Sequence, residues 1–254
     1  MLFKKEEAYQ NALCMDLTPE RFQLSIIDRK QKKILHFEEF EVEEFSRDFV
    51  KSILTNDILK HDFGTFSLSA GSERNTLIPF ELFSHARPDE IFKLNYPEPI
   101  DNLDYNRISE MGIVNIYEIP LWIKSLFVIK FPRIKIIHRS TVLLKGVFDK
   151  HIFSPKIHLH IENHQFYMWI TDKAKLVYFN RFDYKELADL VYYVLFVLEQ
   201  KEFDQTKFEL LLYGLSQDWE LLKTFQNYFD AKVKIAVKKE ESENFMLAKQ
   251  LLCV

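Results

Sequence analysis

A seven-residue pattern occurs twice in the chain, and it constrains the fold more than any other feature. Residues 22–28 and 166–172 both read Phe, any residue, an apolar residue, any residue, Ile, any residue, Asp. Apolar residues alternate in the flanking segments, which is typical of half-buried strands. A segment with a helical apolar pattern follows each copy, over 43–54 and over 183–200, where Asp183 has capping-box spacing to Glu186. The sequence therefore predicts an internal duplication.

Both halves are predicted to run strand, strand, strand, helix, strand, helix, strand, helix. The first half has strands over 12–17, 21–27, 33–41, 65–68 and 134–138, with helices over 43–54, 121–131 and 140–148. The second half has strands over 156–162, 165–171, 175–182, 207–213 and 232–237, with helices over 183–200, 218–228 and 244–252. These ranges alternate strand and helix after an opening meander, as in an α/β protein.

The region 75–112 interrupts this order because it holds four prolines, which restrict regular structure. We expect an insertion of loops and short helices there, with room for one hairpin, before a strand over 113–119. Its aromatic residues are candidate anchors for a protein partner, since aromatics are enriched at interfaces. Alternatively, they attach the insertion to the core. These aromatics include Phe80, Phe83, Phe92 and Tyr96.

The order of elements resembles one half of the actin-like ATPase fold, which is RNase H-like and is shared by sugar kinases and Hsp70 chaperones. The sequence also resembles a bacterial family of unknown function described as actin-like in fold, and is more distantly similar to actin-like pilus-assembly proteins. This resemblance implies an α/β fold in which two duplicated βββαβαβα lobes face a cleft. The expected lobes span residues 1–150, with the insertion, and residues 151–254.

The resemblance implies that ATP would contact the hairpin joining the first two strands of each half. Such hairpins normally carry Asp-x-Gly, where Gly allows backbone N–H groups to approach phosphate. In the first hairpin Asp16 matches the acid, but Thr18 replaces the Gly and Pro19 lacks an N–H donor. The second hairpin has Glu162 but no Gly, and the adenosine loop offers only Gly214. Asp16, Thr18, Glu162 and Gly214 are therefore the cofactor-binding residues only if ATP binds.

With five glycines in the whole chain, we expect no cofactor and no catalytic residue. The leading hypothesis is a non-catalytic binding or scaffolding module, and the alternative is a degenerate actin-like ATPase or kinase. His158 and His160 could hold a metal, but we expect them to be solvent-facing residues of an alternating strand. Asp28 and Asp172 end strands, where Asp commonly forms turns.

Composition narrows the remaining classes of function. The formal net charge of −4 argues against a nucleic-acid binder, which would need many phosphate contacts. Only two cysteines are present and the first residues lack the apolar core of a signal peptide, so we expect a cytoplasmic protein. Without a basic amphipathic helix, a scaffold at the membrane would act through a protein partner, with no direct membrane contact. The partner and the oligomeric state stay open.

Overall fold

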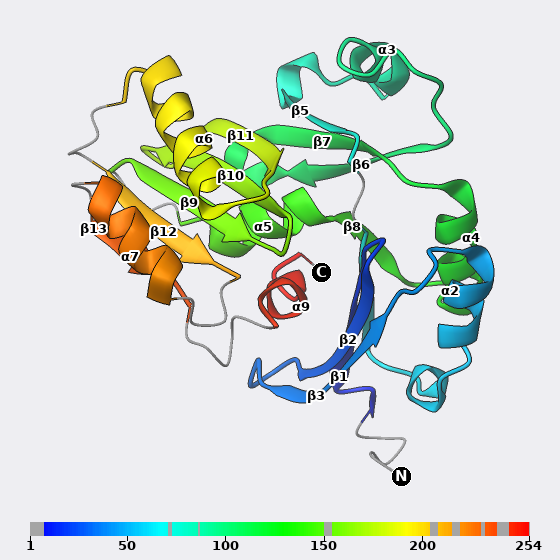
Figure 1. Cartoon of the computed structure of the whole chain (residues 1–254). Helices are drawn as coiled ribbons and strands as arrows, with labels where there is room; N and C mark the ends of the chain where they lie inside the picture. Colours follow the sequence, from blue (N-terminus) through cyan, green and yellow to red (C-terminus); the bar gives the residue numbers. More distant parts are fainter. Residues whose placement is uncertain are drawn as a thin grey trace. The chain divides into compact units, whose positions relative to one another are not determined.

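The computed structural model describes residues 8–70, 73–85, 87–149, 154–203, 208–214, 219–229, 232–237 and 244–253 (Figure 1). These residues form two compact units. One unit comprises the described residues of Met1–Val147 and Met246–Val254, and the other those of Phe148–Phe245. The predicted boundary near residue 150 lies close to this division. The C-terminal residues from Met246 on differ from the expected second lobe, because they pack in the first unit.

The first unit is built on a five-stranded mixed sheet with the order β3-β2-β1-β4-β8. Its strands are β1 (Asn11–Leu17), β2 (Arg21–Asp28), β3 (Ile34–Glu41), β4 (Thr65–Ala70) and β8 (Lys135–His138). Strand β1 is buried at every residue because it is the central strand, antiparallel to β2 and parallel to β4. Asp28 confirms its predicted turn role, since its Oδ1 accepts hydrogen bonds from two backbone N–H groups at 2.7 Å.

Helices cover both faces of this sheet (Figure 1). They are α2 (Arg47–Ile53), α4 (Leu121–Lys130), α5 (Arg139–Val147) and α9 (Phe245–Gln250), and a short 3-10 helix, η1 (Asp57–Lys60), precedes β4. Helices α2 and α4 pack with the apolar side chains of β1 and β2 on one face. On the other face Leu247 of α9 packs against Ala12, Cys14 and Ile27. The predicted last helix therefore exists, but it completes the first core.

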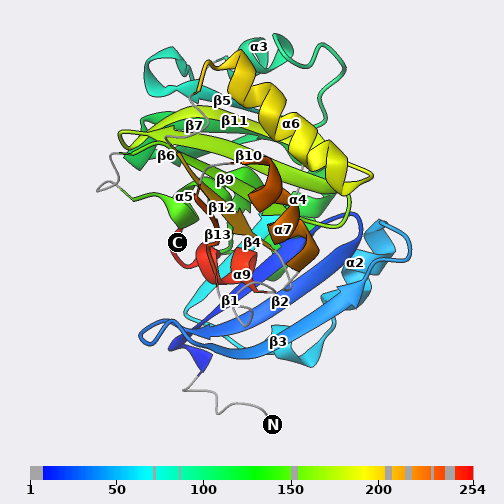
Figure 2. The same ribbon diagram turned by 60° about the vertical axis from the view of Figure 1, so that its left-hand side comes forward.

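The second unit repeats the sheet, with the order β11-β10-β9-β12-β13. Its elements are β9 (Lys156–Ile161), β10 (Gln165–Asp172), β11 (Lys175–Asp183), α6 (Leu187–Gln200), β12 (Glu209–Tyr213), α7 (Trp219–Tyr228) and β13 (Lys232–Ile235). Helices α6 and α7 pack against the sheet through one apolar cluster, and both views show them together (Figure 2). The predicted cap of α6 was wrong, since Asp183 still belongs to β11. The N–H of Glu186 instead donates to the Asp189 carboxylate at 3.1 Å.

The inserted region is more ordered than the sequence suggested. It contains β5 (Asn75–Pro79), the 3-10 helix η2 (Phe80–Leu82), α3 (Pro88–Lys93), β6 (Leu103–Ile108), the 3-10 helix η3 (Ser109–Met111) and β7 (Ile113–Glu118). The three strands form an antiparallel sheet in the order β5-β7-β6. The strand predicted over 113–119 is confirmed, but it is the centre of this small sheet and not part of the five-stranded one. The insertion therefore extends beyond residue 112.

The four aromatic residues named from the sequence attach the insertion to a core, which is the alternative that the sequence left open. Phe92 is fully buried with Ile78, Val114 and Ile116, because these side chains form a small core of their own. Phe80, Phe83 and Tyr96 pack against this core as partly buried neighbours. The most exposed large apolar side chains of the described insertion are Leu82 and Leu94, at 66% and 83%, and Tyr105 is 37% exposed.

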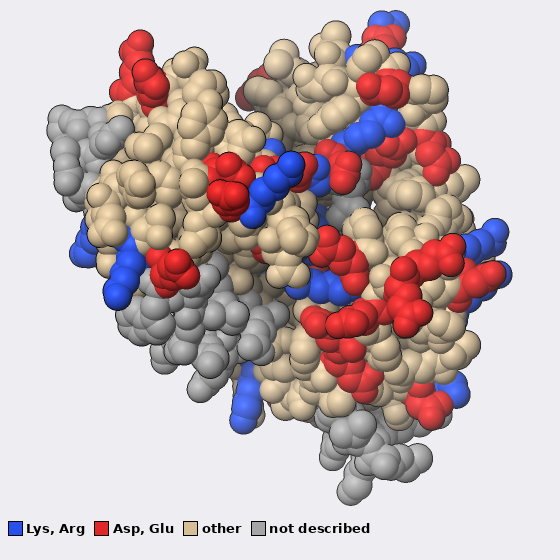
Figure 3. All heavy atoms as spheres, viewed as in Figure 1, with Lys and Arg blue, Asp and Glu red and all other residues tan. Residues whose placement is uncertain are grey.

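Charged side chains of both signs lie on the face seen in Figure 3, and the acidic ones gather at its lower right. This mixture follows from a composition with 34 Lys and Arg residues and 38 Asp and Glu residues. Within the described ranges, no helix has the length and apolar character required to cross a bilayer.

Candidate functional site at the ends of the central strands

The two five-stranded sheets share their pairing registers, and this identifies equivalent positions. Asp16 in β1 lies beside Ser69 in β4, one residue before the end of β1. In the second sheet His160 in β9 lies beside Tyr213 in β12, one residue before the end of β9. Glu162 follows β9 and is therefore not the structural counterpart of Asp16. The acid of the first half and the acid of the second half occupy different positions of the duplicated fold.

Asp16 is fully buried and forms an ion pair with Arg139, the first residue of α5. Nη1 of Arg139 donates to Oδ2 of Asp16, whereas Oδ1 of Asp16 has no hydrogen-bond partner among the described residues. Arg139 is itself only 1% exposed. A buried carboxylate without a counter-ion is costly, and Arg139 supplies a counter-ion beside Asp16. The carboxylate is thus engaged by the protein's own cation.

Other buried polar side chains surround the ends of the same strands. Nδ2 of Asn115 lies 3.0 Å from Oγ1 of Thr141 and 3.2 Å from Nδ1 of His138. The backbone N–H of Ser140 also donates to Nδ1 of His138, at 3.2 Å. Because both donors point at Nδ1, the proton of neutral His138 lies on Nε2. Within the described ranges, the hydroxyl oxygens of Ser69 and Ser140 are buried and have no hydrogen-bond partner.

This cluster is not a recognisable metal centre. In the part of the chain that the structure describes, no three His, Cys, Asp or Glu side chains are grouped so that they could hold a metal ion. A divalent cation in a protein site is usually bound by several oxygen, nitrogen or sulfur ligands. At Asp16 the neighbouring charge is the positive charge of Arg139. The arrangement is that of a closed ion pair within a polar network.

The first hairpin uses its own backbone donors internally. The N–H of Thr18 donates to the carbonyl of Arg21 at 2.9 Å. Oγ1 of Thr18 accepts from the N–H of Glu20 at 3.4 Å and from that of Arg21 at 3.1 Å. Pro19 has no N–H. Every backbone N–H from Thr18 to Arg21 is therefore paired, so the hairpin offers no nest of donors to phosphate oxygens.

In the second hairpin Glu162 is also engaged. Nε2 of Gln165 donates to Oε2 of Glu162 at 2.9 Å, and Nε2 of His160 lies 3.4 Å from Oε1. The hydroxyl of Tyr184 donates to the backbone carbonyl of Glu162 at 2.5 Å. These contacts hold the Glu162 carboxylate against its own hairpin.

Gly214 has a packing role that does not require adenosine. Its φ is +77°, in the left-handed region that favours glycine. A Cβ at this position would lie 2.5 Å from the backbone oxygen of Ile161 and 3.0 Å from the ring of His160. Glycine therefore lets the end of β12 approach the end of β9. Asp16 and Thr18 lie together in the first unit, while Glu162 and Gly214 lie together in the second.

His158 and His160 are both 3% exposed, so the expectation that they face solvent was wrong. Strand β9 is central, and both of its faces are covered, as its burial pattern shows. His158 stacks parallel to Trp169 with ring centroids 5.0 Å apart, and its Nδ1 lies 3.0 Å from the hydroxyl of Tyr213. Burial, together with the nearby charge of Lys156, lowers the pKa of His158 to about 3. This side chain is therefore neutral at physiological pH.

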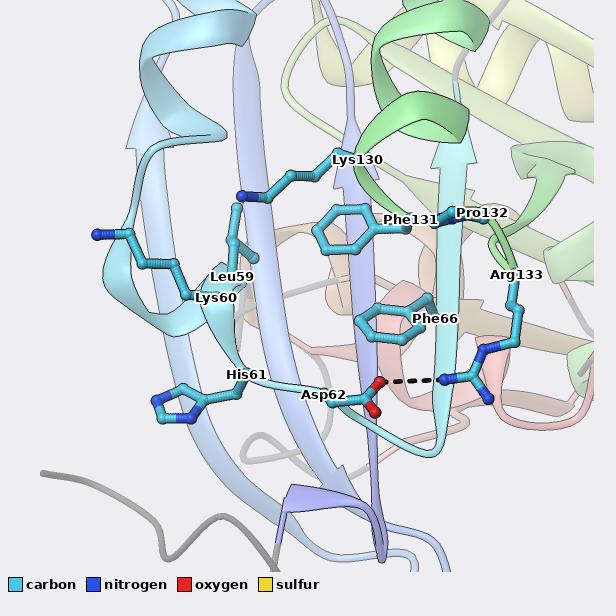
Figure 4. A pocket seen from close by; sticks show the side chains of 9 residues that line it. All are labelled: Leu59, Lys60, His61, Asp62, Phe66, Lys130, Phe131, Pro132 and Arg133. Atoms are coloured by element: carbon cyan, nitrogen blue, oxygen red, sulfur yellow. Dashed lines mark hydrogen bonds and ion pairs between the residues drawn. The ribbon is translucent and has the colours of Figure 1, made fainter.

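A cavity of about 370 Å³ opens at the other end of the first sheet (Figure 4). The stacked rings of Phe66 and Phe131 lie in its middle, 4.8 Å apart. Arg133 forms an ion pair with Asp62 at 3.0 Å across one side. Phe66 is near the start of β4, whereas Asp16 lies beside the end of that strand. The cavity is therefore distinct from the strand-end cluster.

Solved structures establish the class of the fold. A protein with actin-like ATPase fold and unknown function from Bacteroides thetaiotaomicron is 22% identical, covers 99% of each chain and has a TM-score of 0.85. A PilM-PilN type IV pilus biogenesis complex has a TM-score of 0.59 at 12% identity, with 95% of this chain and 97% of that chain covered. The cytoplasmic domain of EpsL from Vibrio cholerae has a TM-score of 0.53 at 8% identity, with 96% and 94% covered.

The protein therefore has an actin-like ATPase fold, as predicted. The chain belongs to the family described as "Protein of unknown function (DUF3822)", whose model matches residues 2–231. No curated protein sequence matches the chain.

Two residues at the strand ends, His160 and Arg139, were not predicted from the sequence to be part of the candidate site. His160 could have been found, because extending the repeat backwards from Phe22 and Phe166 aligns it with Asp16. Arg139 gave no comparable signal, since it meets Asp16 only after a separation of 123 residues.

Proposed function

We propose that this protein is a cytoplasmic, non-catalytic binding or scaffolding module that keeps an actin-like ATPase fold without nucleotide chemistry. The observation that carries this proposal is the buried ion pair between Asp16 and Arg139. In the ATPases that the fold resembles, the acid of the first hairpin works through a metal ion. Here a guanidinium takes the place of that cation, so binding a metal would require separation of a buried pair.

The first hairpin supports the same proposal. Phosphate binding by this fold depends on free backbone N–H groups, and the groups from Thr18 to Arg21 are already paired. His160, which occupies the position equivalent to Asp16, is buried against the ring of Phe245 at 5.4 Å. At both equivalent positions, Asp16 and His160, the side chain contacts other parts of the protein.

The named solved structures of similar fold suggest what such a module does. One is a complex of two pilus-biogenesis proteins, and another is a component of a secretion system. We propose that this chain likewise binds a protein partner, and that the insertion supplies the contact surface. Leu82 and Leu94 are its most exposed large apolar side chains, and the buried centre of an interface is more apolar than the rest of a protein surface.

Isothermal titration calorimetry with Mg-ATP tests the loss of nucleotide binding. We expect no saturable heat from the wild-type chain. The alternative function is a degenerate ATPase or kinase that uses Asp16, Thr18, Glu162 and Gly214, and the unpartnered Oδ1 of Asp16 is the observation in its favour. Saturable binding that is lost in an Asp16→Asn variant would establish this alternative and overturn the proposal.

The contact surface is tested by substitution, because deleting 75–112 would remove two strands of the inserted sheet. We expect Leu82→Asp and Leu94→Asp to abolish recovery of the native partner in affinity purification from the host. Val177→Asp is the matched control, since Val177 is also exposed, at 42%, but lies in β11. Unchanged recovery with both insertion variants would place the partner elsewhere.

A further inference from the structure

Strand β3 is an open edge of the first five-stranded sheet, beyond β2 (Figure 2). It is eight residues long and pairs with β2 alone. The N–H of Val42 donates to the carbonyl of Glu20 at 2.9 Å, which fixes the phase of hydrogen bonding between the two strands. Because antiparallel pairs alternate, the N–H and C=O groups of Phe37, Glu39 and Glu41 point away from β2. Among the described residues these groups have no backbone partner.

The edges of β13 and β8 are protected in ways that β3 lacks. Strand β13 has only four residues. At β8 the Asn106 side chain occupies the edge, since its Nδ2 donates to the carbonyl of Ile136 at 3.2 Å and its Oδ1 accepts from the N–H of His138 at 2.7 Å. Lysine, proline and bulges also protect edge strands. Strand β3 contains neither lysine nor proline, and its one register shift lies near its start.

Acidic side chains gather at the second half of β3 and directly after it. They are Glu38, Glu39, Glu41, Glu43 and Glu44. Two cations stand against them, namely Arg21, which lies opposite Glu41 in the ladder, and Arg47, which begins α2. Asp48 and Lys51 pair with each other at 3.5 Å and cancel. Five negative and two positive charges leave an excess of three negative charges.

The contacts of these acids within the chain do not remove that excess. Nε2 of Gln23 donates to Oε2 of Glu39. Glu38 accepts a hydrogen bond from Nδ2 of Asn56 at 3.1 Å, and its Oε1 lies 2.9 Å from Nε2 of His36. The two amides are uncharged, and His36 is charged only when it is protonated. The charge of this edge is therefore negative in either state of His36.

The duplicated sheet provides an internal comparison. Strand β11 occupies the position of β3 in the second sheet, and it is likewise a long edge strand, of nine residues. Where β3 has Glu39 and Glu41, β11 has Arg181 and Asp183, as the registers with β2 and β10 show. The two charges of β11 have opposite signs. The acidic character of β3 is therefore not required by an edge strand in this fold.

We propose that β3 is a docking edge for an extended segment of another protein that is rich in lysine or arginine. The segment adds a strand beside β3 and pairs with the outward backbone groups of Phe37, Glu39 and Glu41. Side chains alternate between the faces of a sheet, so a cation at every second position lies on the face of the exposed Glu39 and Glu41. A second copy of β3 brings acids against acids, which disfavours pairing of the chain with itself.

The two ends of this edge differ in charge, and this sets where the cations of the segment lie. The turn before β3 is basic, with Arg29, Lys30, Lys32 and Lys33. Cationic residues of the segment therefore belong beside the second half of β3 and not beside this turn. Leu35, in the first half, is 43% exposed and favours an apolar residue of the segment there.

The test is fluorescence anisotropy of the full chain with a short labelled peptide of alternating valine and lysine. We expect saturable binding, and no binding of the same peptide with glutamate in place of lysine. N-methylation of two consecutive central amides prevents both edges of the peptide from pairing, so it should weaken binding about tenfold or more. Slower hydrogen exchange of the backbone amides of residues 37–41 in the complex gives a second readout.

Substitution locates the binding edge. Glu39→Lys and Glu41→Lys should each weaken binding of the lysine peptide about tenfold or more, because an attractive charge becomes a repulsive one. Asp183→Lys, at the equivalent position of β11, is the matched control and should leave the affinity unchanged. Circular dichroism checks that each variant folds, and Glu39→Gln is the milder variant. Leu82→Asp should bind the peptide as the wild type does, so failure of this proposal and failure of the contact surface proposed for the insertion are distinguishable.

Three results would overturn the proposal. The first is absence of saturable binding of the lysine peptide. The second is equal binding of the N-methylated peptide, or an equal loss of affinity in Asp183→Lys, since either places the contact elsewhere than on the backbone edge of β3. The third is protection of residues 37–41 that rises with the concentration of the peptide-free chain, which would assign the edge to a second copy.

Discussion

The two five-stranded sheets have the same strand order and the same pairing register, yet their central strands end in opposite chemistry. In the first unit Asp16 is paired with Arg139 among small polar side chains. In the second unit His160 lies between aromatic rings, 5.4 Å from Phe245 and 6.4 Å from Tyr167. The duplicated sheet therefore depends on the apolar alternation of its strands and tolerates either chemistry at their ends.

This difference also bears on function. A nucleotide site of this fold would contact polar groups at both strand ends, and each unit engages part of its own strand end in a different way. The first uses an ion pair and the second uses ring stacking. The predictions below separate the two routes, beginning with the largest expected effect.

The ion pair of the first unit should be the most sensitive contact. Arg139→Met leaves the Asp16 carboxylate buried without its guanidinium, which lowers the free energy of unfolding by about 3–5 kcal/mol. Asp16→Asn removes the carboxylate that Arg139 contacts and should also lower the free energy of unfolding. Urea denaturation followed by circular dichroism measures the change. The double variant Asp16→Asn/Arg139→Met removes both charges and should recover most of the loss. Losses that simply add in the double variant would show that the pair is not coupled.

In the second unit the most sensitive position should be Gly214. Gly214→Ala combines a left-handed backbone with a clash at 2.5 Å from the oxygen of Ile161, and should cost about 3 kcal/mol in unfolding free energy. Gly112→Ala is the control, because Gly112 has φ +65° but open space around it. It should cost only about 1–2 kcal/mol. Equal losses in the two variants would show that β9 and β12 do not approach as closely as described.

The buried histidine of the second unit should make stability depend on pH. The pKa of His158 is about 3 in the folded state, against an ordinary value of 6.5. Below pH 6.5 the unfolded chain therefore binds a proton that the folded chain does not. The stabilisation is complete above pH 6.5 and is lost as pH falls towards 3, by at most about 1.4 kcal/mol per pH unit.

His158→Gln removes this titration without adding a charge. Urea midpoints measured between pH 7 and pH 4 should fall less steeply in the variant than in the wild type. Parallel curves would mean that His158 is protonated in the folded protein as readily as in the unfolded one. Asp16→Asn, in the first unit, is measured in the same way. It tests whether the slope of the urea midpoint against pH depends on His158 or changes with any buried polar substitution.

The smallest effect should come from the first hairpin. Thr18→Val removes the hydroxyl that accepts from the N–H groups of Glu20 and Arg21, and should cost about 1 kcal/mol. Thr55→Val is the control, because its hydroxyl makes a single exposed bond to Ser52. Thermal denaturation compares them. A Thr18→Val variant as stable as the control would show that water replaces the hydroxyl.

Most of the fold could be predicted from the sequence, because the repeated pattern lies at the same pairing register in both sheets. Phe22 and Phe166 occupy the same pairing position, beside Leu17 and Ile161 respectively. The insertion was harder to predict. The strand over 113–119 was expected, but β5 and β6 were not located in the proline-containing region, and the small core forms only when Phe92 meets Val114 and Ile116. The sequence also did not predict that the last helix packs in the first unit. The hydrogen bond between Gln250 and Ser67 joins distant parts of the chain and has no local pattern.

The candidate site was predictable only in part. The absence of glycines in the hairpins was visible, because residue type decides which backbone donors are available. The burial of His158 was not, since an alternating strand looks the same whether its polar face meets solvent or a second layer. The engagement of Asp16 by Arg139 depends on tertiary packing and has no local pattern.

A crystal structure of the protein grown with magnesium and a non-hydrolysable ATP analogue tests the central claim most directly. The strand ends of both units should be unchanged, with Asp16 still paired to Arg139 and no nucleotide bound. A magnesium ion on the Asp16 carboxylate, with Arg139 displaced and phosphate oxygens beside Thr18, would contradict the account.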